Sequence, residues 1–127
     1  GKTCYAMTGD NRYHSIFGAV KSCIAVNPSD TAPALVALGA MMKTNKRIMD
    51  AGSFWDMREP GSTVLEADEI LVEIQMPSPS PGIKSAFIKF ALRKSIDFPV
   101  VNCAAAIGDA ILVAAARLLA FCVRLTP

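Results

Sequence analysis

The spacing of hydrophobic residues predicts a short helix in residues 27–40 (NPSDTAPALVALGA), where Leu35 and Leu38 can share one helical face. Gly39 follows them and is suited to end the helix in a left-handed conformation. Because isolated helices of this length are marginal in water, we expect the segment to pack against the rest of the chain.

The beginning of this helix is polar. Ser29 and Asp30 are residue types whose side-chain oxygens accept hydrogen bonds from free backbone N–H groups of a first helical turn. Such a polar beginning can also hold the edge of a polar ligand. The pattern taken alone favours an ordinary capped helix, and it leaves a ligand-binding role open.

The alternation of apolar and polar residues predicts several strands before residue 77. Residues 40–43 and 47–49 form a hairpin around a three-residue turn, and a short helix over 51–57 follows, whose Phe54 and Trp55 we expect in the core. The clearest strand is ILVEIQM, in which four apolar residues alternate onto one face: Ile70, Val72, Ile74 and Met76. Leu71 lies on the opposite, polar face as an exception.

A proline-rich connector, residues 77–82, is the expected domain boundary. Beyond it, alternation over residues 86–93 predicts a half-buried strand with Lys89 on its basic outer face. Residues 100–107 are rich in β-branched and small residues, and this composition predicts a second strand. Helix propensity alone predicts an apolar helix over residues 110–124.

Composition narrows the class of protein. The 127 residues are 52% hydrophobic with a net charge of +2, which supports a packed core and argues against a nucleic-acid partner. Asp109 and Arg117 interrupt the most apolar stretch, so we expect no membrane insertion. The four cysteines form no CxxC pair, which favours a reduced, cytoplasmic protein. The chain opens on Gly1 rather than Met, so we expect it to be part of a longer protein.

Three linked motifs carry a family resemblance over about residues 1–108: NPSDTAPALVALGA, LEADEILVEIQMP and SAFIKFALRKSIDFPVVNCAAAI. In order and spacing they resemble the FAD-binding (medium) subunit of molybdenum hydroxylases, the family of xanthine dehydrogenase, carbon monoxide dehydrogenase and 4-hydroxybenzoyl-CoA reductase. The resemblance implies an α+β fold, with residues 1–76 ending a two-subdomain FAD-binding domain. Residues 83–127 would begin an incomplete antiparallel, three-stranded C-terminal domain, with a strand in place of the helix after residue 109.

The resemblance also implies a flavin half-site. Ser29 and Asp30 match its Ser-Asp motif, Leu71 matches a leucine that lies against FAD, and Lys89 matches a lysine that approaches the flavin. Asp30 would combine helix capping with a hydrogen bond to the ligand, and it would matter more than the outward-facing Lys89. By the same resemblance, the glycine loops that bind the pyrophosphate would be expected upstream of this sequence.

Cys4 and Cys23 leave two readings open. In the branch resembling 4-hydroxybenzoyl-CoA reductase, the flavin subunit carries an extra [4Fe–4S] cluster, and these residues would be the last two of its four ligands. Two thiolates alone cannot complete such a site, and free structural thiols are the favoured interpretation.

The functional expectation is an oxidoreductase subunit that takes electrons onto FAD and passes them to NAD or another acceptor. Its partners would be subunits or domains that carry molybdopterin and [2Fe–2S] clusters. A non-catalytic interaction module that keeps the fold without flavin is the alternative. The substrate is not encoded in these residues.

Overall fold

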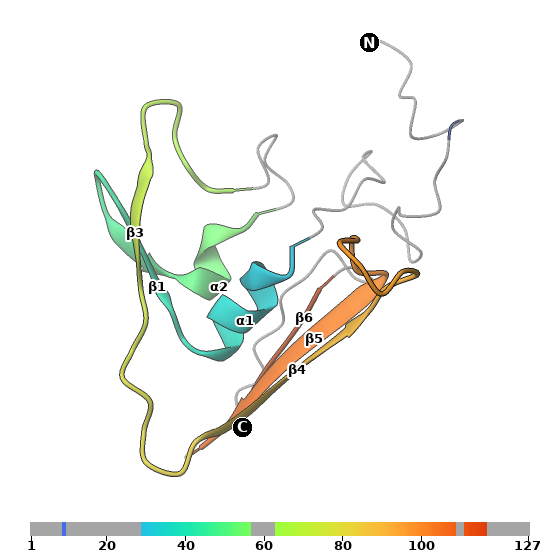
Figure 1. The fold of residues 1–127 in the computed structure, drawn as a ribbon. Helices are drawn as coiled ribbons and strands as arrows, with labels where there is room; N and C mark the ends of the chain where they lie inside the picture. Colours follow the sequence, from blue (N-terminus) through green and yellow to red (C-terminus); the bar gives the residue numbers. More distant parts are fainter. Residues whose placement is uncertain (1–8, 10–28, 57–62, 109–110, 117–127) are drawn as a thin grey trace.

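The computed structural model describes residue 9 and residues 29–56, 63–108 and 111–116, with side-chain detail up to residue 108. In chain order the elements are α1 (Thr31–Ala37), β1 (Met41–Thr44), β2 (Ile48–Asp50), α2 (Ala51–Phe54), β3 (Leu71–Gln75), β4 (Lys84–Phe90), β5 (Val101–Ile107) and β6 (Ile111–Ala116). They form two antiparallel three-stranded sheets, ordered β2-β1-β3 and β4-β5-β6. The helices lie between the two sheets (Figure 1). The predicted mixture of helices and antiparallel strands is therefore confirmed.

Helix α1 ends as the sequence predicts. Gly39 has a φ of +69°, which a glycine adopts without a steric penalty. The backbone N–H of Ala40 donates to the carbonyl of Leu35 at 2.9 Å, and that of Gly39 donates to Val36 at 3.1 Å. This pair of bonds is the Schellman arrangement, which satisfies carbonyls at the end of a helix.

The predicted apolar face of α1 is confirmed for Leu35 and wrong for Leu38. Leu35 is half-buried against the hydrophobic cluster, whereas Leu38 is exposed at the end of the helix. The buried positions are smaller residues: Ala32, Pro33, Val36 and Ala37. Because α1 packs against β5 and β6, small side chains on that side allow its backbone to approach the sheet.

One hydrophobic cluster joins both sheets. Its buried members are Val36, Ala37, Ala40, Met42, Ala51, Phe54 and Ala104. Phe54 packs edge-on against Trp55, with ring centroids 5.2 Å apart, which confirms the expected core role of this aromatic pair. The connector at residues 77–82 is exposed throughout. The proposed domain boundary there remains a prediction, since Ala104 in β5 shares its cluster with the first sheet.

Strand β3 forms as predicted, but its buried face was assigned wrongly. The register between β1 and β3 shifts between Lys43 and Thr44, so that Met42 pairs with Ile74 while Thr44 pairs with Leu71. Such a bulge reverses the alternation of side chains along a strand. Leu71 therefore faces the cluster and is half-buried against it, whereas the predicted apolar face is exposed at Ile70, Val72, Ile74 and Met76.

The helix predicted over residues 110–124 is wrong for residues 111–116. Residues 111–116 form β6, which pairs antiparallel with β5 from Asn102↔Ala116 to Ile107↔Ile111. The third strand that the resemblance implied is present. Helix propensity is a weak prior, and the chance to pair with β5 overrides it here.

Candidate functional site

The first part of the candidate site is the N-terminal end of α1. Ser29 caps the helix, because its Oγ accepts a hydrogen bond from the backbone N–H of Ala32 at 3.0 Å. Asp30 makes no capping bond with its side chain, so the expectation that it combines capping with ligand binding is wrong on the first point. The Asp30 carboxylate is directed to other partners.

Asp30 and Lys89 meet although 59 residues separate them. The Lys89 Nζ lies 2.6 Å from Oδ2 of Asp30 and donates a second hydrogen bond to the carbonyl of Asp97 at 2.7 Å. The two side chains are 28% and 43% exposed for Lys89 and Asp30, respectively. An exposed charged pair of this kind contributes only about 0.2–1 kcal/mol to stability.

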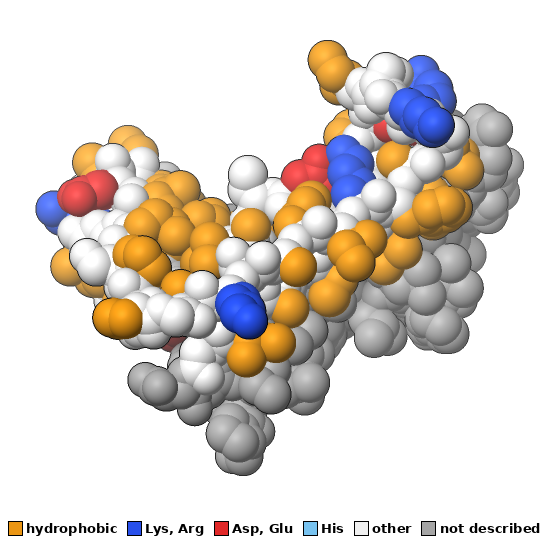
Figure 2. All heavy atoms as spheres, turned by 60° about the horizontal axis from the view of Figure 1, so that its bottom comes forward, with side chains coloured by type: hydrophobic (Ala, Val, Ile, Leu, Met, Phe, Trp, Pro, Cys, Tyr) orange, Lys and Arg blue, Asp and Glu red, His pale blue; other side chains and the backbone are white. Residues whose placement is uncertain are grey.

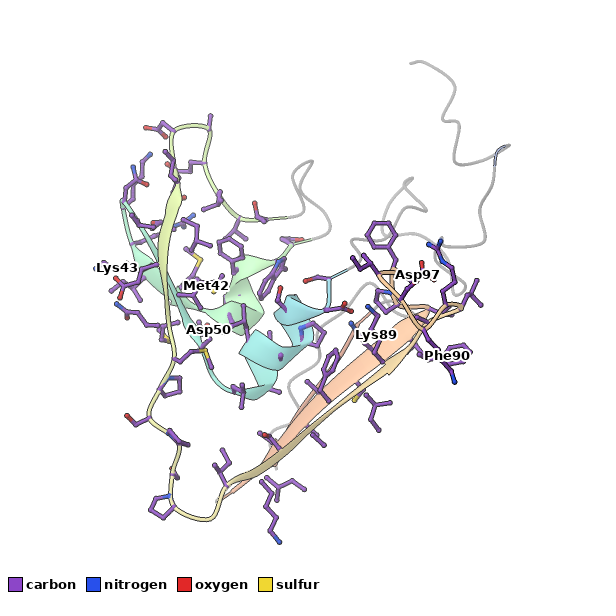
Figure 3. All side chains as sticks on the ribbon, viewed as in Figure 1. Met42, Lys43, Asp50, Lys89, Phe90 and Asp97 are labelled. Atoms are coloured by element: carbon purple, nitrogen blue, oxygen red, sulfur yellow. The ribbon has the colours of Figure 1, made fainter. Side chains whose placement is uncertain are left out.

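Lys89 does not point outward, as its place in the strand pattern suggested. In Figure 3, Lys89 and Phe90 project to opposite sides of β4, and Lys89 points toward α1. Lys89 pairs with Asn102 of β5 in the sheet register, and the same face carries the buried Ala104. The outer face instead carries Ile88 and Phe90, which are exposed. Exposed hydrophobic side chains are also spread over the face of the molecule seen in Figure 2.

Asn102 is the residue of this group that the sequence analysis missed. Its Nδ2 donates to the backbone carbonyl of Ser29 at 2.9 Å and to Oδ1 of Asp30 at 3.0 Å. The only sequence signal was a polar residue within the apolar run VVNCAAAI. A buried polar group requires partners, and the run alone could not identify them.

Leu71 is not brought into this group. It belongs to the other sheet, where the preceding segment is tied to the β1–β2 turn. Asn45 accepts a hydrogen bond from the backbone N–H of Ile70 at 2.9 Å, and its own N–H donates to the carbonyl of Ile70 at 3.1 Å. These contacts place Leu71 at the beginning of β3.

Glu69 completes this attachment, and the sequence analysis gave it no role. Its buried carboxylate accepts hydrogen bonds from Thr44 Oγ1 (2.7 Å), from two nitrogens of Arg47 (2.9 and 2.8 Å) and from the backbone of Glu66 (3.1 Å). The Arg47 guanidinium, and then Thr44, lower the pKa of Glu69 from 4.5 to about 2. Glu69 is therefore a structural anion that fixes the residues before Leu71.

The chemistry of the Asp30–Lys89 pair fits the edge of a polar ring such as a flavin. An ammonium has three donors, of which Lys89 uses two, and a carboxylate has about four acceptor positions, of which Asp30 uses two. The half-exposed pair can therefore offer both a donor and an acceptor to a ligand. Asp30, Lys89 and Ser29 would hold such a ligand from this side.

Metal chemistry finds no support in the part of the chain that the structure covers. No group of three or more His, Cys, Asp or Glu residues there could hold a metal ion. Cys4 and Cys23 lie outside the described residues, so their role as cluster ligands stays a prediction. No described helix is long and apolar enough to cross a membrane.

Comparisons with known proteins were made for the whole chain. No family model matches it. Over 117 residues the chain is 32% identical to the FAD-binding subunit PaoB of an aldehyde oxidoreductase from Escherichia coli (strain K12), which covers 84% of the chain and 36% of that subunit.

Two solved structures are similar in fold. A carbon monoxide dehydrogenase from Hydrogenophaga pseudoflava, which lacks the Mo-pyranopterin moiety of its molybdenum cofactor, matches with a TM-score of 0.62 at 23% identity, over 76% of this chain and 36% of that one. Quinoline 2-oxidoreductase from Pseudomonas putida 86 matches with a TM-score of 0.57 at 27% identity, over 71% of this chain and 33% of that one.

These matches agree with the three motifs quoted above. The chain spans about a third of the length of the proteins it resembles, at 36%, 36% and 33%. The predicted relationship is confirmed: this chain is related to the FAD-binding subunits of the molybdenum hydroxylases.

Proposed function

We propose that the chain is part of the flavin subunit of a molybdopterin-dependent oxidoreductase, in which Asp30 and Lys89 contact FAD. The observation that carries the proposal is their meeting at 2.6 Å, since each lies in a separate motif that resembles a flavin-contacting segment of the family. The curated relative that the chain matches is named as an FAD-binding subunit. In the whole enzyme, electrons from a molybdopterin site would reach FAD through [2Fe–2S] clusters and pass to NAD or another acceptor.

When bound, the isoalloxazine supplies the redox chemistry, and the protein supplies orientation and electrostatic tuning. Lys89 would place a positive charge near the ring, which favours its reduced, anionic form. Asp30 compensates part of that charge, because its carboxylate lies directly against the ammonium. Their opposite charges predict opposite effects on the flavin potential when each is neutralised.

Leu71 would contribute an apolar contact from the other sheet. It is half-buried, so part of its side chain remains available to a ligand, and the segment before it is held by the Glu69 network. The bulge opposite Thr44 supports this role, since it directs Leu71 toward the helices rather than away from them.

A flavin-free interaction module is the second candidate. The observation that favours it is that both oxygens of Asp30 already have donors, from Asn102 and from Lys89, so the group can also exist as a purely structural contact.

The visible absorption spectrum of the full-length protein containing this chain separates the two candidates. After incubation with FAD and removal of unbound cofactor, the flavin-subunit proposal predicts flavin bands with about one FAD per protein. A protein without flavin bands after this reconstitution would favour the interaction module.

A further inference from the structure

Asn102 stands out among the buried residues because it is the polar residue on an otherwise small, apolar face of β5. Only 1% of its surface is exposed, and Ala104 and Ala106 follow it on the same side of the strand. Its partner across the sheet is Lys89. Burying an amide here costs stability unless its polar atoms are paired.

Both hydrogens of the Asn102 amide are used on the beginning of α1. One is donated to the carbonyl of Ser29 and the other to Oδ1 of Asp30, at 2.9 and 3.0 Å. Both partners accept only, which fixes the orientation of the amide, because a flipped amide would place its oxygen against two oxygens. Asn102 thus holds one oxygen of Asp30, while Lys89 holds the other.

The amide oxygen of Asn102 differs from its nitrogen in lacking hydrogen bonds within the described part of the chain. Oδ1 of Asn102 is buried and has no hydrogen-bond partner among the residues that the structure describes. Buried polar atoms are rarely left unpaired, because the loss of hydration is not repaid. An apolar side chain of similar size would fill the same space without this cost, so packing alone does not account for an asparagine at this position.

We propose that Asn102 is a positioning residue of the flavin site: it orients the Asp30 carboxylate so that Asp30 and Lys89 present one fixed donor–acceptor pair to the cofactor. The inference rests on the proposed function, and it adds a residue that lies 72 positions from Asp30 in the sequence. Asn102 itself is buried and acts through Asp30, without touching FAD.

The test is a double-mutant cycle for FAD affinity in the full-length protein. Asn102→Leu, Asp30→Ala and the double variant are titrated with FAD, and unfolding is followed in parallel. Asn102→Leu should bind FAD about tenfold more weakly, the size expected for one lost hydrogen bond to a charged group. Its melting temperature should fall only modestly, because leucine has the same number of side-chain heavy atoms and removes the unpaired oxygen, while the Ser29 carbonyl loses this donor.

The double variant distinguishes positioning from general damage. If Asn102 acts through Asp30, then adding Asn102→Leu to Asp30→Ala should weaken FAD binding no further. Cys103→Ala is the matched control, because Cys103 is the neighbouring half-buried residue on the other face of β5, and its FAD affinity should stay within about twofold.

Two outcomes would overturn the inference: unchanged FAD affinity in Asn102→Leu, and affinity losses that multiply in the double variant. If Asn102→Leu does not fold, Asn102→Ala replaces it in the same cycle, and multiplicative losses there count equally against positioning. Failure of the unmodified protein to take up FAD would instead refute the proposed function itself, and this inference with it.

Discussion

The two sheets are held together by different means. The β2-β1-β3 sheet and its helix α2 bury large side chains, Met42 and Phe54, at 1% and 5% exposure. The β4-β5-β6 sheet buries Asn102 and two alanines, Ala104 and Ala106, beneath α1. Large buried side chains contribute most of the hydrophobic stabilisation. Among the described side chains, the first sheet therefore contributes the large members of the shared cluster, whereas β5 contributes small residues that fit against α1.

Their buried polar groups differ in the same way. The carboxylate of Glu69 is paired with donors on both oxygens, and its side chain is wholly buried. Within the described part of the chain, the Asn102 amide nitrogen is paired and its oxygen is not, next to the half-exposed Asp30 and Lys89. A completed network fits a structural role, whereas partly used donors and acceptors beside solvent fit a place where a ligand binds. The comparison thus separates the part of the molecule that supports the candidate site from the part that would form it.

The largest expected effect is in the core of the first sheet. Met42→Ala should lower the free energy of unfolding by about 2–5 kcal/mol, because it leaves a cavity between the strands and helices. Urea unfolding of the full-length protein measures this. Met41→Ala is the control, since Met41 precedes Met42 on the other face and is only half-buried. Equal losses in both variants would show that Met42 is not the centre of the core.

Glu69 should make the first sheet sensitive to acid. Its folded-state pKa is lowered from 4.5 to about 2, chiefly by Arg47, so its contribution is present above about pH 4.5 and disappears as the pH falls toward 2. Glu69→Gln should destabilise the protein at pH 7, by less than Met42→Ala, and should unfold with a weaker pH dependence. Between pH 7 and pH 3, the melting temperatures of the unmodified protein and of Glu69→Gln should converge. A difference in melting temperature that stays constant over this range would contradict the stabilising role of the ionised Glu69.

The second sheet should respond to added volume rather than to lost volume. Ala104→Leu places a large side chain where α1 meets β5 and should cost about 1–3 kcal/mol through overpacking. Ala105→Leu, on the other, half-buried face of the strand, should cost less. If both substitutions were tolerated equally in urea unfolding, the close fit between helix and sheet would not be needed.

The smallest effects on stability are expected from substitutions of Ser29 and Asp30, the two neighbouring residues at the beginning of α1. Ser29→Ala removes the cap and should cost about 1 kcal/mol, within the usual range of 0.5–2 kcal/mol. Asp30→Asn should cost less, because Asp30 makes no capping bond, its ion pair with Lys89 is partly exposed, and asparagine keeps an acceptor for the buried Asn102 amide. Thermal unfolding of both variants decides the order, and a larger loss for Asp30→Asn than for Ser29→Ala would contradict it.

Features that depend on neighbouring residues were predictable from the sequence. The direction in which a strand side chain points was not, where it depends on residues distant in the sequence. Gly39 ends α1 as its residue type predicts, because that conformation depends on the glycine alone. The orientation of Leu71 depends on a bulge against β1, and that of Lys89 depends on Asp30, which lies 59 residues earlier. Residues 111–116 pair with β5 against their helix propensity. Motif resemblance placed Asp30 and Lys89 in one site because it carries information on such distant contacts.

Asn102 shows the limit of that reasoning most clearly. A single asparagine in VVNCAAAI has no periodic or motif signal of its own, and its partners Ser29 and Asp30 lie more than 70 residues away. Only the pairing of β5 with β4, together with the packing of α1 on β5, reveals which groups it contacts.

The midpoint potential of bound FAD tests the central claim most directly, because Asp30 and Lys89 carry opposite charges. In the full-length protein, Asp30→Asn should raise the potential, since it leaves the Lys89 ammonium uncompensated near the reduced ring. Lys89→Met should lower it, since the charge that favours the anionic flavin is removed. Asp50→Asn is the control, because Asp50 caps α2 beside the other sheet, and it should leave the potential unchanged. Potentials that shift in these opposite directions would support the flavin contact; bound FAD whose potential is the same in all four proteins would contradict it.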